Sequence, residues 1–137
     1  MPSADVAFAS AGAAILRQQF EAIRAVDAGV RLGDDVEAIH DMRVATRRLR
    51  EAIRVFATDD LRETFAPNTA TAREMADALG AVRDLDVLRD NLRARAEAIP
   101  ADARALQVLL DALESARDGR RPELLALLDG PAARRFL

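Results

Sequence analysis

The chain has no cysteine, tryptophan or tyrosine among its 137 residues, and aromatic residues make up only 4% of it. The lack of cysteine excludes disulfides, thiolate metal sites and cysteine nucleophiles, and it fits a reducing compartment. The scarcity of aromatic residues, beside abundant Ala and Leu, favours helices over strands. No apolar run approaches the length needed to cross a bilayer, and no signal-peptide pattern opens the sequence. We therefore expect a soluble, cytoplasmic, all-α protein with no membrane partner.

Lysine is also absent, so all 20 basic residues are arginines, and they are outnumbered by 23 acidic residues to give a net charge of −3. A general nucleic-acid binder usually carries a large basic excess. No aromatic side chains alternate with the arginines to stack on bases. These observations argue against a nucleic-acid partner and restrict any anion binding to one face of the molecule.

Glycine and proline divide the chain into helical segments. Gly29 is placed to close the first segment, Pro67 precedes the third, and Pro100 precedes the fourth, which Gly119 and Pro122 should interrupt or kink. The last six residues resemble the opening of a further helix. Apolar residues recur at helical spacing within the segments. The pattern predicts one domain over residues 1–137, a four-helix bundle with up-down-up-down topology and helices at about 5–28, 35–57, 68–98 and 101–128.

The second segment carries a row of cations at alternating intervals of three and four residues. At about 100° per residue, they fall in a strip about 80° wide along one side of the helix. Asp34 and Glu37 have the spacing of a capping box that would start this helix. An apolar row about 100° further round, which includes Ile39, Met42 and Leu49, should face the core. We call the row of cations the cationic ridge; it consists of His40, Arg43, Arg47, Arg50 and Arg54.

Arginines three and four residues apart on a helix repel one another by a few tenths of a kcal/mol per pair. Glu51 can offset part of this repulsion. The ridge could simply be a solvated face, or could pair with carboxylates of neighbouring helices. It could also bind a repeating polyanion, since the arginine fork donates two parallel hydrogen bonds to phosphate.

A second notable block runs from Leu79 to Leu88 in the third segment. Gly80 disfavours a helix by about 1 kcal/mol relative to alanine, which suggests that another backbone passes close by. Arg83 could reach the same anion as the ridge, or the carboxylates that follow it could hold the ridge by ion pairs. Those carboxylates do not have a spacing that converges on a metal ion, so we predict neither a metal site nor a cofactor; they are Asp84, Asp86 and Asp90.

Residues 40–50, His-Asp-Met-Arg-Val-Ala-Thr-Arg-Arg-Leu-Arg, resemble the signature of the CHAD domain, an α-helical domain named for its histidines. The block from Leu79 to Leu88 resembles the second signature of that family at a suitable distance. The resemblance covers nearly the whole chain and is sharpest from Val36 to Leu92.

The resemblance implies binding of inorganic polyphosphate by basic side chains in a non-catalytic module. Such domains often accompany polyphosphate-cleaving domains or localise to polyphosphate granules. Arg54 is added to the family's positions from helical geometry, and Arg48 lies off the ridge by the same geometry. The expected polyphosphate-binding residues are His40, Arg43, Arg47, Arg48, Arg50, Arg54 and Arg83.

A full family member contains two such four-helix halves related by a pseudo-twofold, and this chain resembles the first. We therefore expect a homodimer in which a second copy replaces the other half. Two other functions stay open. One is an enzyme acting on phosphoanhydrides with His40 as acid–base or phosphoryl acceptor, and the other is a purely structural helical bundle.

Overall fold

The computed structural model describes Met1 and residues 3–137, and no strand occurs in that part of the chain. The all-α helical prediction is confirmed. The helices are α1 (Ala4–Leu32), α2 (Val36–Phe56), α3 (Asp59–Ala98), the 3₁₀ helix η1 (Pro100–Asp102), α4 (Ala103–Asp129) and the short α5 (Pro131–Phe136).

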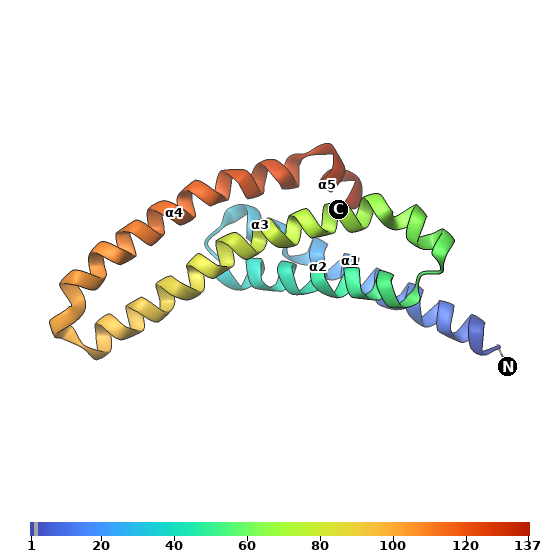
Figure 1. The fold of residues 1–137 in the computed structure, drawn as a ribbon, viewed down its shortest axis with the longest axis horizontal. Helices are drawn as coiled ribbons and strands as arrows, with labels where there is room; N and C mark the ends of the chain where they lie inside the picture. The colour runs from blue at the N-terminus through green and yellow to red at the C-terminus, as the bar shows by residue number, and fades with distance from the viewer. Residues whose placement is uncertain (2) are drawn as a thin grey trace.

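Successive helices pack side by side, α1 on α2, α2 on α3 and α3 on α4. Figure 1 shows that α3, the longest helix described, runs along the molecule between α2 and α4. The far end of α3 and the first part of α4 extend beyond α1 and α2 as a two-helix arm. The chain then returns along α4, and α5 folds back against α3 and α4. None of the helices in the described part of the chain is long and apolar enough to cross a membrane.

The core lies where α1, α2 and α3 overlap, and α4 and α5 add Leu128 and Phe136 to it. Ile39, Met42 and Leu49 of the predicted apolar row are fully buried. From α3, Met75, Leu79 and Val82 join them in one cluster. At about 25 cal/mol per Å² of apolar surface removed from water, this cluster is the main favourable term that holds α2 in place.

The turn between α1 and α2 differs from the prediction by a few residues. α1 continues past Gly29 and ends at Gly33, whose φ of 82° is the left-handed conformation that glycine adopts readily. The N-cap of α2 is Asp35 rather than Asp34, because its carboxylate accepts hydrogen bonds from the N–H groups of Glu37 and Ala38. The expected capping box of Asp34 and Glu37 is therefore wrong.

The expected break of the chain at Pro67 is also wrong. α3 begins at Asp59 and runs through Pro67, where Figure 1 shows the N-terminal part of the helix turning away from the rest. A proline kink of this kind keeps the helix continuous although one backbone hydrogen bond is lost. α4 likewise runs through Gly119 and Pro122. Contacts to other helices on both sides of Pro122, described below, outweigh its low helix propensity.

Candidate functional site: an arginine-lined face of α2 and α3

The cationic ridge lies on the solvent-facing side of α2, close to α3: Arg43 lies beside Gly80 of α3, and Arg50 and Arg54 line a groove with α3. Arg43, Arg47 and Arg54 are exposed, while His40 and Arg50 are half-buried. The buried apolar row on the other side of α2 fixes the rotation of the helix, so the whole ridge stays at the surface. In this way the periodicity of the core decides which direction the arginines face.

The two sequence blocks meet across the α2–α3 contact. The Arg43 Nε lies beside Gly80 of α3, 3.4 Å from where a Cβ of that residue would be. The Arg83 guanidinium lies 3.7 Å from the Glu37 carboxylate at the start of α2. Gly80 is therefore close to the side chain of Arg43, and not to another backbone as expected.

A groove of about 800 Å³ lies between the second half of α2 and the first part of α3. Arg50 and Arg54 line it from α2, and α3 adds Arg62 and Arg73, two arginines absent from the predicted set. Glu51 is the acidic residue in its wall. Arg62 and Arg73 are eleven residues apart, which is three helical turns and returns to the same face. The shared face of Arg62 and Arg73 is apparent only if α3 starts at Asp59. The predicted helix started at residue 68 and therefore excluded Arg62.

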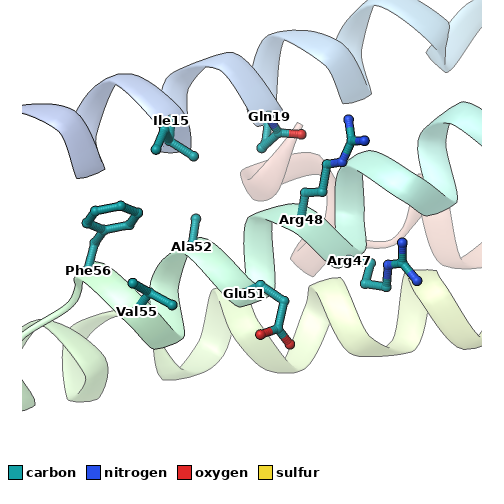
Figure 2. Close-up of a pocket in the computed structure, with 8 residues that line it drawn as sticks. All are labelled: Ile15, Gln19, Arg47, Arg48, Glu51, Ala52, Val55 and Phe56. Carbon is teal, nitrogen blue, oxygen red and sulfur yellow. The ribbon is translucent and has the colours of Figure 1, made fainter.

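Arg48 lies on the side of α2 that faces α1. Figure 2 shows it extending towards α1, while Glu51 points to the opposite side. With Arg47 it borders a hollow of about 470 Å³ between α1 and α2, whose wall includes the apolar residues Ile15 and Val55. The prediction that Arg48 is off the ridge agrees with this geometry, and its surroundings differ from those of the ridge.

Most of the site arginines have no protein partner. Within residues 3–137, the guanidinium groups of Arg43, Arg47, Arg48, Arg50 and Arg73 make no ion pair and no hydrogen bond. The Nε of Arg50 is buried without an acceptor, a state that disfavours folding by about 1–3 kcal/mol for a polar group. Arg54 pairs with Glu51 at 2.8 Å, but both side chains are more than half exposed, so this pair contributes little. The face thus has more cation than its own carboxylates can neutralise.

The carboxylates after Arg83 do not hold the ridge. Asp86 is fully buried and lies 2.6 Å from Arg117 of α4 and 3.3 Å from Arg89. Asp90 pairs with Arg89 at 3.1 Å, and Asp84 is exposed. The alternative in which these carboxylates hold the ridge by ion pairs is therefore wrong, and Asp86 instead connects α3 to α4.

Asp86 belongs to a second group of charges where α4 meets the end of α1. Arg117 donates to the Gly33 carbonyl at 3.1 Å, and Arg121 donates to the Arg31 carbonyl at 2.9 Å. Arg31 pairs with Asp27 at 2.8 Å and with Asp129 at 2.6 Å, and these hydrogen bonds raise the pKa of Arg31 above its ordinary value. We call Arg31, Arg117 and Arg121 the junction arginines.

An all-α bundle with one arginine-lined helix defines the general class of this protein. Comparison with protein families is more specific, because residues 14–137 match the model of the CHAD domain. The chain belongs to the CHAD family, whose members are generally binding modules associated with polyphosphate.

One curated relative is the uncharacterized protein Rv2226 of Mycobacterium tuberculosis. It is 32% identical over 119 residues, which cover 80% of this chain and 22% of the relative. The chain thus spans about a fifth of that protein's length. No solved structure gives a significant match to the chain.

Proposed function

We propose that the protein binds inorganic polyphosphate along the cationic ridge, as a non-catalytic targeting or regulatory module. The observation that supports this most is the set of unpaired arginines at the ridge in a chain with more acidic than basic residues. A purely structural bundle would pair these side chains with its abundant carboxylates, as the junction arginines are paired.

The geometry of α2 suits a linear chain of phosphates. Successive ridge residues rise by about 5.4 Å per helical turn, so they form a row of donors along a straight line. Arg48 on the α1 side and Arg83 from α3 flank this row. The ridge residues, Arg48 and Arg83 together are the polyphosphate-binding set that we propose.

Binding through guanidinium–phosphate contacts releases counterions, so affinity should fall steeply as salt is added. The test is calorimetric titration with long-chain polyphosphate and with single-stranded DNA of equal charge, both at about 0.15 M salt, where screening acts over about 8 Å. We expect submicromolar affinity for polyphosphate and much weaker binding of DNA. Equal affinity for both polymers would indicate a nonspecific cationic surface, and failure to bind polyphosphate would overturn the proposal.

We also propose that two copies associate through the apolar end of the α1–α2 face, where Ile15, Val55 and Phe56 lie away from Arg47 and Arg48 in Figure 2. Phe8 and Val55 are each 51% exposed there, and Ile15 is 36% exposed. Apolar side chains grouped beside a hollow are typical of a surface that another chain covers. Light scattering at micromolar concentration should give twice the chain mass, and Val55→Glu should shift it towards the monomer. A wild-type monomer would contradict this part of the proposal.

A further inference from the structure

The groove between α2 and the first part of α3 has features that the ridge as a whole does not share. Four guanidinium groups line it, from Arg50, Arg54, Arg62 and Arg73, against the one carboxylate of Glu51. Its volume of about 800 Å³ is within the range of about 300–1,000 Å³ that is usual for small-ligand sites. The ridge residues nearer the start of α2 do not line it.

Several donors in this groove have no acceptor within residues 3–137. The Nε of Arg50 is buried and unpaired. Arg73 makes no ion pair, and the Thr69 hydroxyl, which also lines the groove, makes no hydrogen bond. Buried donors in folded proteins normally have partners, so the unpaired Arg50 Nε points to an acceptor from outside the protein, whereas the exposed Arg73 guanidinium is free to bind one.

Arg62 lines the groove from the first turn of α3, and its side chain is 53% exposed. Its guanidinium donates to the Arg54 carbonyl at 3.0 Å and lies 3.3 Å from the Asp59 carboxylate. These contacts place Arg62 near the turn between α2 and α3. Four guanidinium groups gathered in one groove suit an oxyanion of a few phosphate groups.

We propose that this groove is a distinct subsite for a short phosphoanhydride of two or three phosphate groups, either free or as one segment of a longer chain. The inference rests on the proposed function and adds Arg62, Arg73 and Thr69 to the binding residues. Arginine forks and a hydroxyl supply charge-assisted donors on several sides of a phosphate group. The Arg54–Glu51 pair would open on binding, which requires little energy because the pair is exposed.

The test uses sodium tripolyphosphate and long-chain polyphosphate as calorimetric probes in magnesium-free buffer. Arg73→Gln removes an exposed, unpaired groove cation, so the fold should be retained, which circular dichroism checks. Arg95→Gln is the matched control, since Arg95 is an exposed arginine far along α3. We expect Arg73→Gln to weaken tripolyphosphate binding at least tenfold, Thr69→Val to weaken it several-fold, and Arg95→Gln to leave it unchanged.

Arg47→Gln separates the subsite from the ridge. It should weaken long-chain binding and leave tripolyphosphate binding nearly unchanged. The subsite proposal is wrong if tripolyphosphate does not bind, or if it binds equally to wild type and Arg73→Gln. In that case the ridge proposal is still supported if Arg47→Gln weakens the binding of long-chain polyphosphate. If neither probe binds the wild type, both proposals fail together.

Discussion

The junction arginines and the arginines of the cationic ridge have the same side chain and opposite surroundings. At the junction, Arg117 is 13% exposed and bonded to the buried Asp86 and to a backbone carbonyl. On the ridge, Arg43 and Arg47 are exposed and have no acceptor within the described residues. A guanidinium whose donors are already used can support the fold but has little left for a ligand. The difference shows that the number of arginines says less about function than the number left unpaired.

The largest expected effect is the loss of a junction carboxylate. Asp86→Ala leaves Arg117 with uncompensated charge in a buried setting, while Arg89 keeps its pair with Asp90, so it should reduce the free energy of unfolding by about 3–5 kcal/mol. Urea unfolding followed by circular dichroism measures the change. Asp84→Ala, two residues away and exposed, is the control and should stay within about 0.5 kcal/mol of wild type. Equal effects of the two substitutions would contradict the structural role of Asp86.

The next largest effect should be on binding alone. Arg43→Gln with Arg47→Gln removes two charge-assisted donors worth about 1.5–3 kcal/mol each, so polyphosphate affinity should fall by roughly 100-fold or more. The salt dependence of binding should also become shallower. Because neither side chain has a protein partner, the free energy of unfolding should change little. The charge-matched control is Arg95→Gln with Arg104→Gln, and a similar loss of affinity in that variant would refute a specific ridge.

A smaller effect is expected at the turn that the junction arginines hold. Gly33→Ala places a Cβ at φ 82°, where L-residues are disfavoured by about 1–2 kcal/mol, and the Cβ would also meet the Arg121 guanidinium. We expect a lower melting temperature with unchanged polyphosphate affinity. Gly119→Ala is the control, because nothing lies near a Cβ at that position. It should be neutral or slightly stabilising.

The smallest effect concerns the contact of α3 with the ridge. Gly80→Ala should stabilise the protein by up to about 1 kcal/mol, because its Cβ would meet only the flexible Arg43 side chain at 3.4 Å. Polyphosphate affinity should stay near wild type. Gly80→Leu should displace Arg43 and weaken binding, as measured by the same titration. Destabilisation by Gly80→Ala would show that closer packing is needed there.

The sequence predicted best those features that repeat along a single helix. The apolar row of α2 and its exposed cations followed from the 3.6-residue period, and both lie where they were expected. The period also held for Met75, Leu79 and Val82. By contrast, Leu88 of α3 and Leu109 of α4 are 47% and 52% exposed. A helical period shows which side of a helix is apolar, but not whether another helix covers it.

The error at Pro67 had a consequence for the site. Starting α3 after Pro67 left Arg62 outside any helix, so its match in phase with Arg73 was hidden. The role of Asp86 could not be predicted either. Its partner Arg117 lies 31 residues further along the chain, and the helical spacing of residues does not indicate which residues of two different helices will pair. Contacts between distant segments depend on how helices are placed in space, which local patterns do not encode.

The bonds from Arg117 and Arg121 to the end of α1 join residues 84 to 91 positions apart. Phe20 of α1 and Phe136 of α5 also meet, with ring centroids 5.0 Å apart. The contacts of α1 with α2, α2 with α3 and α3 with α4, in contrast, need only short loops to close. Contacts that are close in sequence form early in folding because they confine less chain, whereas long-range closure comes later. We therefore expect the helical hairpins to form first. The hydrogen bonds from α4 to the end of α1 should form last. During synthesis on the ribosome, the cationic ridge of α2 would therefore be complete before the contacts between α4 and α1 have formed.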